Sequence, residues 1–271
     1  MKHAMKSGVL GLSLLLANGS IAHAQDFEKG YRALEKGDYS TALKEWSPLA
    51  EQGNSEAQYN LGLMYNNGHG VTQNFNEAVK WFRLAAMQGK VEAQYNIGTM
   101  YLTGQGVTQD FKEALKWYRL AAAQGNAEAQ SNLGLMYGKG DGVTQDYNEA
   151  VRWYRLSAAQ GNTDAQFNLG YMYENGRGVV QDFTEAASWY RLAAKQGNAR
   201  AQSNLGVMYH YGQGVIQDNV YAHMWLNIAA SSGDDVALKN RDIITKSMAA
   251  ADISKAQGLA RACVQKNFEG C

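Results

Sequence analysis

Residues 57–92 read AQYNLGLMYNNGHGVTQNFNEAVKWFRLAAMQGKVE, and close copies of this stretch follow it along the chain. The dipeptide Ala-Gln recurs at positions 57, 93, 129, 165 and 201, and tryptophan recurs at 81, 117, 153, 189 and 225. Both series advance by 36 residues at every step. A fixed period of this length is typical of repeat proteins, in which each copy forms one structural unit. The sequence therefore predicts five tandem units over residues 57–236.

Each unit contains two segments with helical spacing of apolar residues. In the first segment, which starts at Ala57, they fall at i, i+4, i+7 and i+8; in the second, which starts at Ala78, they fall at i, i+3, i+4 and i+7. Gly68 and Gly70 separate the two segments, and Gly89 ends the second. Each unit is therefore a helical hairpin. One hairpin cannot bury its own apolar face, so neighbouring hairpins must stack and share a core.

One glycine recurs inside every first helix, where it costs about 1 kcal/mol relative to alanine. The five positions are Gly62, Gly98, Gly134, Gly170 and Gly206. We expect two helices to approach closely there. The small residues expected opposite them, on the second helices, are Ala78, Ala114, Ala150, Ala186 and Ala222.

The repeated motif resembles that of a known family. A-Q-x-N-L-G-x-M-Y, G-x-G-V and E-A-x-x-W-Y-R-x-A-A-x-Q-G are near-complete in repeats two to four, and the chain is similar to Sel-one-like repeat proteins of the tetratricopeptide superfamily. The resemblance implies an all-α fold, a right-handed α-solenoid of stacked helical hairpins. The first repeat departs from the motif at Phe82, and the fifth departs most, over residues 221–226.

The flanks of the repeats have separate interpretations. Residues 25–56 resemble a degenerate N-terminal capping repeat with a turn at Gly37 and Asp38 and a proline, Pro48, in its second helix. Residues 237–271 are interpreted as C-terminal capping helices, which give a solenoid a polar end.

Residues 1–24 have the pattern of a cleaved signal peptide. Lys2 and Lys6 precede the apolar run GVLGLSLLLA, and Ala22-His23-Ala24 forms an A-x-A cleavage site. The alternative is a buried N-terminal helix. The signal peptide predicts a periplasmic or secreted protein, and no later apolar run is long enough for a transmembrane anchor.

Cys263 and Cys271 are separated by VQKNFEG. In an exported protein, an isolated pair this close predicts a disulfide that holds the last helix. Two thiols without nearby histidines supply only half of a tetrahedral metal site, and the C-x-x-C motif of redox enzymes is absent.

The residues give little sign of catalysis or of a cofactor. The 25 basic and 25 acidic side chains balance, so the chain lacks the basic excess typical of nucleic-acid binding. The motifs S-x-x-K with S-D-N and K-T-G, G-x-S-x-G, H-E-x-x-H and the P-loop do not occur. His69, His210 and His223 are interpreted as surface residues, with no metal site. We therefore predict a protein that is not an enzyme and needs no cofactor.

A comparison of the five copies predicts a binding surface. Positions that stay constant serve packing, whereas three first-helix positions at i, i+4 and i+7 vary between copies and share one face. In tetratricopeptide-like folds this helix lines the concave groove, so we expect these positions to bind a peptide or protein segment; the alternative is unconstrained surface. The predicted groove residues are Tyr59, Leu63, Tyr95, Thr99, Leu102, Leu135, Phe167, Tyr171, Glu174, Val207 and His210, with Tyr211 beside them.

Three functions are compatible with these observations. The favoured one is an exported bacterial scaffold or adaptor that binds a protein partner. The second is an envelope hydrolase of the β-lactamase-like or cell-wall type, as proposed for cysteine-rich members of the resembling family. The third is a purely structural envelope component. The partner is not identified by the sequence.

Overall fold

The computed structural model describes residues 26–271, so the signal peptide predicted for residues 1–24 lies outside the described residues. The chain divides into two compact units, one ending at Gln124 and one beginning at Gly125. Each unit is described by itself.

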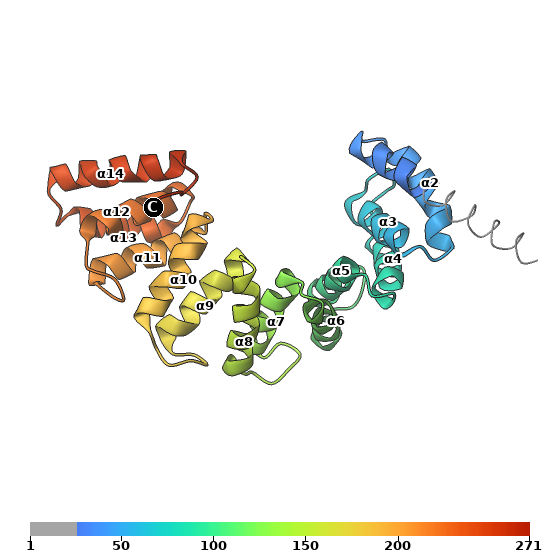
Figure 1. Ribbon diagram of the computed structural model, residues 1–271, viewed down its shortest axis with the longest axis horizontal. Helices are drawn as coiled ribbons and strands as arrows, with labels where there is room; N and C mark the ends of the chain where they lie inside the picture. Colours follow the sequence, from blue (N-terminus) through green and yellow to red (C-terminus); the bar gives the residue numbers. More distant parts are fainter. Residues whose placement is uncertain (1–25) are drawn as a thin grey trace, which may run out of the picture. The chain divides into compact units, whose positions relative to one another are not determined.

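Every regular element of the described residues is a helix, and no strand occurs in residues 26–271 (Figure 1). The first unit contains a helical segment over 26–35, then α2 (Tyr39–Glu51), α3 (Ser55–Asn67), α4 (Phe75–Met87), α5 (Val91–Thr103) and α6 (Phe111–Ala123). The second unit contains α7 (Ala127–Lys139), α8 (Tyr147–Ala159), α9 (Thr163–Asn175), α10 (Phe183–Lys195), α11 (Ala199–Tyr211), α12 (Asn219–Ser231), α13 (Asp235–Thr245) and α14 (Ala250–Gln265). The predicted all-α fold is confirmed.

The helices pair as the hairpins that the period predicts. In the first unit α3 packs on α4 and α5 on α6; in the second, α7 packs on α8, α9 on α10 and α11 on α12. Successive hairpins also pack on each other, because α4 contacts α5, α8 contacts α9 and α10 contacts α11. None of the described helices combines the length and apolar character needed to cross a membrane.

Local capping explains where the helices begin and end. The side chain of Asp182 accepts hydrogen bonds from the backbone N–H groups of Thr184 (2.8 Å) and Glu185 (3.0 Å) and so starts α10. Gly176 ends α9 in the left-handed conformation, with φ of 63°. Gly178, two residues later, has φ of 70°, and a Cβ there would stand 2.2 Å from the carbonyl oxygen of Tyr147 in the preceding repeat. The G-x-G motif therefore turns the chain, and Gly178 seats repeat four on repeat three within the second unit.

In repeats one to four the glycine inside the first helix leaves room for an aromatic ring of the second helix; in repeat five a Cβ on Gly206 would meet Leu226 Cγ at 2.7 Å and the carbonyl oxygen of Ala222 at 3.1 Å. A Cβ on Gly170 would lie 2.7 Å from the ring of Tyr190, and one on Gly134 would lie 2.6 Å from the ring of Tyr154. The expectation of close approach is confirmed, but the atoms that need the space differ from those expected. They belong to the large buried side chain four residues after the alanine of the second helix, because that residue points back across the hairpin.

A buried glutamine links successive repeats within each unit. In repeat four, Gln166 donates from Nε2 to the carbonyl oxygen of Ala158 at 3.3 Å and accepts at Oε1 from Gln196 Nε2 at 2.7 Å. In repeat two, Gln94 makes the same two bonds with Ala86 and Gln124. These bonds satisfy polar groups that the stacking of hairpins would otherwise bury without partners.

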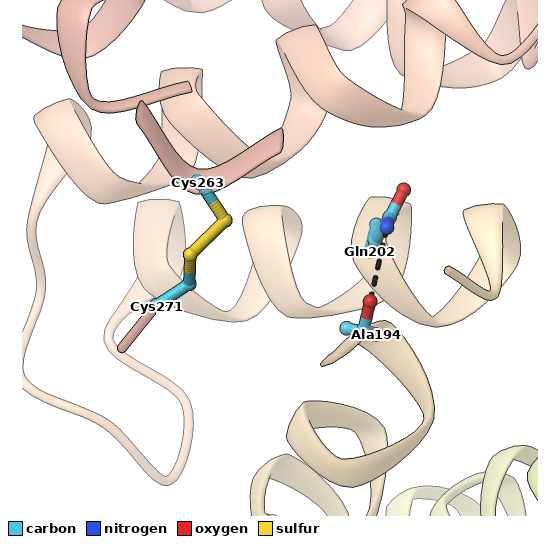
Figure 2. Close-up of a disulfide and its surroundings, with 4 residues drawn as sticks. All are labelled: Ala194, Gln202, Cys263 and Cys271. Atoms are coloured by element: carbon cyan, nitrogen blue, oxygen red, sulfur yellow. Dashed lines mark hydrogen bonds between the residues drawn. A yellow bond between two sulfur atoms is a disulfide. The ribbon is translucent and has the colours of Figure 1, made fainter. Parts of the chain in front are cut away.

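The last helix closes the second unit. Cys263 and Cys271 form the predicted disulfide, with their Cα atoms 5.7 Å apart (Figure 2). α14 packs on α12, where Ile228 and Trp225 join Cys263 in one core cluster. Trp225 is only 1% exposed, so the terminal helix covers a face of α12.

Candidate functional site

The variable positions lie on α3 and α5 in the first unit and on α7, α9 and α11 in the second. We call them the first-helix face and divide them into three sets by their place in the helix. The inner set is Tyr59, Tyr95, Ser131, Phe167 and Ser203; the middle set is Leu63, Thr99, Leu135, Tyr171 and Val207; the outer set is Asn66, Leu102, Gly138, Glu174 and His210.

The inner set packs onto the second helix of its own hairpin. Ring centroids are 5.8 Å apart for Tyr95 and Tyr118 and 5.7 Å apart for Phe167 and Tyr190; Tyr59 lies on Phe82 in the same way. Tyr59 and Tyr95 stay partly exposed.

Phe167 departs from the expectation of an exposed anchor. It is 8% exposed, and the guanidinium of Arg200 lies 4.4 Å from its ring centroid. The residue is buried because its ring fills the space between the Tyr190 ring and the next repeat. Phe167 is therefore part of the core and not a groove residue.

The middle and outer sets form the accessible part of the face. Leu135 and Tyr171 are each 36% exposed, and Tyr211, which follows His210 at the end of α11, is 67% exposed. The remaining predicted residues of these two sets are partly exposed: Leu63, Thr99, Leu102, Glu174, Val207 and His210. Side chains with this exposure are free to contact a partner.

Hydroxyl groups of buried second-helix tyrosines reach this face. The Tyr118 hydroxyl lies 3.0 Å from Thr99 Oγ1, and the Tyr190 hydroxyl donates to Glu174 Oε2 at 2.6 Å. Burial, followed by the hydrogen bond to Glu174, raises the pKa of Tyr190 well above its ordinary value. Both hydroxyls are thus satisfied by residues of the face itself.

A cavity of about 150 Å³ opens on the face in the second unit. Its wall is made by Leu135, Gly138, Lys139, Tyr147, Tyr154, Asn168, Tyr171, Met172 and Arg177. Gly138 has no side chain at a position where repeat two has Leu102 and repeat four has Glu174. The missing side chain exposes the hydroxyl end of Tyr154, which is 3% exposed.

Sequence reasoning missed the asparagines that follow the inner set. Asn60, Asn96, Asn132, Asn168 and Asn204 are identical in all five repeats and partly exposed. The expectation that constant positions serve packing does not hold for these asparagines. The signal in the sequence is a polar residue that stays constant within an otherwise variable face. Such a residue suits main-chain recognition, because an amide can both donate to and accept from a peptide backbone.

Each described histidine has its own local surroundings. His210 Nδ1 lies 2.8 Å from Asn219 Oδ1, and the ring of His69 stacks on Tyr39. His223 is 2% exposed, so its interpretation as a surface residue is wrong. It occupies a core position of α12 that other repeats fill with Val79, Leu115, Val151 and Ala187. Within residues 26–271 no three His, Cys, Asp or Glu side chains gather closely enough to hold a metal.

Comparison with known families now identifies the architecture. The model of the Sel1 repeat matches residues 55–90, 91–126, 127–162, 163–198 and 199–234. The chain belongs to the Sel1 repeat family. These five matches have the 36-residue period found in the sequence and cover the hairpins α3/α4 to α11/α12.

Two solved structures of Sel1 repeat proteins resemble the chain. One is c5321, a protective antigen of uropathogenic Escherichia coli with an SLR (Sel1-like repeat) fold: it is 37% identical, the TM-score is 0.82, and the match covers 94% of this chain and 56% of c5321. The other is a Sel1 repeat protein from Oxalobacter formigenes, 30% identical, with a TM-score of 0.76 and coverage of 87% and 95%. The chain thus spans little more than half the length of c5321. A comparison with curated proteins finds no match.

Proposed function

We propose that this Sel1 repeat protein is a non-enzymatic scaffold that binds a peptide or protein segment on the first-helix face. The observation that carries the proposal is the contrast between positions within one helix. Core positions such as Leu133 and Leu169 are buried and nearly constant between repeats, whereas Leu135 and Tyr171, two residues later, are exposed and differ. Variation at accessible positions beside a nearly constant core position favours recognition of a partner with a defined sequence.

The constant asparagines suit the main chain of a bound segment, and the variable residues suit its side chains. In the second unit, Asn132, Asn168 and Asn204 repeat the same amide on three successive first helices. Amides at regular intervals can hydrogen-bond the main chain of an extended segment, whatever its sequence. The middle and outer sets then contact its side chains, and exposed aromatic residues such as Tyr171 are effective anchors.

A selection of binding peptides from a random library on the full chain tests this proposal. We expect the selected peptides to bind the parent protein and to lose at least about tenfold in affinity when Leu135→Ser and Tyr171→Ala are combined. Leu156→Ser is the matched control, because Leu156 is 44% exposed but lies on a second helix. Peptides that bind the double variant as well as the parent would refute the first-helix face as the binding surface.

We also propose that the protein is exported from a bacterial cell. The signal-peptide pattern of residues 1–24 supports export, and the disulfide between Cys263 and Cys271 suits an oxidising compartment. After expression in a bacterial host, we expect the N-terminus of the mature protein to be Gln25 and the protein to leave the cytoplasm. Recovery of the uncleaved chain from the cytoplasm would contradict export.

The hydrolase alternative has no supporting geometry among the described residues. No three His, Cys, Asp or Glu side chains of residues 26–271 gather closely enough to hold a metal, and Ser131, Ser157 and Ser203 are buried. We expect the purified protein to hydrolyse a chromogenic cephalosporin no faster than buffer does. Turnover that co-purifies with the protein would contradict the non-enzymatic proposal.

A further inference from the structure

The cavity on α7 and α9 contains the accessible hydroxyl end of an otherwise buried tyrosine, Tyr154, and this hydroxyl has no partner among the described residues. Tyr118, Tyr154 and Tyr190 occupy the same position in repeats two, three and four. The hydroxyl of Tyr118 lies against Thr99 and that of Tyr190 donates to Glu174. In repeat three the corresponding positions are Leu135, which has no polar atom in its side chain, and Gly138, which has no side chain. No residue of the described chain hydrogen-bonds the Tyr154 hydroxyl, and burial raises its pKa. A hydroxyl that opens into a cavity and has no protein partner is available to donate to, or accept from, a ligand.

The space beside this hydroxyl is large enough for a short side chain. A Cβ added to Gly138 would meet only the Cβ of Ala150 at 3.8 Å and the Cε of Met172 at 4.0 Å. Leu135 and Met172 make one wall apolar, and Asn168 adds an amide to the lining. The cavity therefore combines a wall for an aliphatic stem with polar groups for a terminal polar atom.

The rim of the cavity is positively charged. The guanidinium of Arg177 lies 5.2 Å from the ring centroid of Tyr171 and 5.6 Å from that of Tyr147. Two aromatic faces hold this cation in place, while its N–H groups stay available to an acceptor. Lys139 lines the same cavity. Neither cation forms an ion pair with a carboxylate among residues 26–271, so the rim offers charge that the chain does not use.

We infer that this cavity binds a carboxylate on a short aliphatic stem, supplied by an acidic side chain or by the C-terminal residue of a peptide partner. The carboxylate accepts hydrogen bonds from Tyr154 and Asn168, and the charges of Arg177 and Lys139 neutralise it. The stem packs against Leu135 and Met172. A purely apolar group would leave the Tyr154 hydroxyl unpaired, and an ammonium group would face two cations. The inference rests on the proposed function and specifies the chemistry of the partner.

NMR titration of the full chain with butyrate, and with butyramide as its uncharged analogue, tests the inference. We expect butyrate to cause saturable shifts at the amides of Gly138, Lys139 and Arg177, and butyramide to bind at least about tenfold more weakly. Tyr154→Phe should weaken butyrate binding at least about fivefold. The matched control is Tyr190→Phe, since the Tyr190 hydroxyl already donates to Glu174. Gly138→Leu should abolish binding and remain folded, because repeat two has leucine at this position.

Short alanine peptides distinguish the two sources of the carboxylate. One peptide has a single central glutamate and an amidated C-terminus, the second has glutamine in its place, and the third has no acidic side chain but a free C-terminus. Competition with butyrate by the first identifies an acidic side chain, and competition by the third identifies a C-terminus. Equal binding of butyrate and butyramide, shifts away from the cavity, or an unchanged affinity in folded Gly138→Leu would each overturn the inference.

Failure of the inference is distinguishable from failure of the proposed function. Suppose that library peptides lose binding in the combined Leu135 and Tyr171 variant and yet show no preference for an acidic group and no response to Tyr154→Phe. That result would support the scaffold function and overturn the carboxylate site. Absence of any peptide that binds the first-helix face would remove the proposed function itself.

Discussion

Gln202 donates its side-chain amide to the carbonyl oxygen of Ala194 at 3.0 Å, but its own Oε1 accepts from no group in residues 26–271 (Figure 2). In repeat four the equivalent oxygen, on Gln166, accepts from Gln196. The residue equivalent to Gln196 in the fifth repeat is Ser232. The serine side chain is too short to reach Gln202 Oε1. Gln202 is 0% exposed, so an unsatisfied oxygen is left in the core at the end of the repeats.

Ser232→Gln should therefore stabilise the protein. The new amide supplies the missing donor, and we expect the free energy of unfolding to rise by about 0.5–1.5 kcal/mol. Ser232 is exposed, which leaves room for the longer side chain. Urea denaturation measures the change. The matched control is Gln196→Ser, which reproduces the fifth repeat in the fourth and should cost about 1–3 kcal/mol. A Ser232→Gln variant no more stable than the parent would contradict this account of the repeat contacts.

Gly170→Ala should destabilise the protein although alanine favours helix. The added Cβ would stand 2.7 Å from the Tyr190 ring, and overpacking of this kind costs about 1–3 kcal/mol. Gly138→Ala is the control in a neighbouring first helix. Its Cβ finds no contact closer than 3.8 Å, so we expect a gain of up to about 0.5–1 kcal/mol. Thermal denaturation followed by circular dichroism compares the two. Equal effects of both substitutions would show that the ring does not require the glycine.

His223 should make stability depend on pH below neutrality. Burial, and next the positive charge of Arg241, lower the pKa of His223 below its ordinary value of 6.5, while Asp242 acts in the opposite direction. The unfolded chain therefore binds a proton at a pH where the folded chain does not. Stability is unaffected well above 6.5 and falls as the pH drops below it, by up to about 1.4 kcal/mol per pH unit for this group.

His223→Val provides the check, because repeats one and three have valine at this position. The variant also removes the buried Nδ1 atom, which has no hydrogen-bond partner in the described chain. We expect greater stability and a smaller change in the urea midpoint between neutral pH and the region just below 6.5. An unchanged pH dependence would assign the effect to other groups.

Reduction of the disulfide should loosen the C-terminal helix. The loop between Cys263 and Cys271 is short, and its closure contributes about 2–3 kcal/mol through restriction of the unfolded chain. Replacement of both cysteines by serine should therefore lower stability and speed amide hydrogen exchange in α14. Amides of α7 to α9 serve as the internal reference, since they lie away from α14 in sequence and pack on other helices. Unchanged exchange in α14 would show that packing alone holds it.

Most of the fold was predictable, because the determinants of each hairpin are local and repeated. The apolar spacing, the glycine turns and the period predicted the helix pairs, and the chain's own five copies separated packing positions from variable ones. The candidate site was predicted less well. The inner set was placed on the surface with the other two, although a residue at that place in the helix faces the ring of its own hairpin, as Phe167 does. The constant asparagines were overlooked because constancy was interpreted as burial.

The sequence by itself determined the family, the 36-residue period of the repeats and the pairing of the two cysteines. Only the tertiary structure decided that Phe167 and His223 are core residues and that Tyr154 ends in a cavity without a hydrogen-bond partner. The physical reason is the separation along the chain of the residues that each property depends on. Helix periodicity and capping depend on residues within a few positions of one another, whereas burial and hydrogen-bond satisfaction depend on side chains that stacking brings together from different helices.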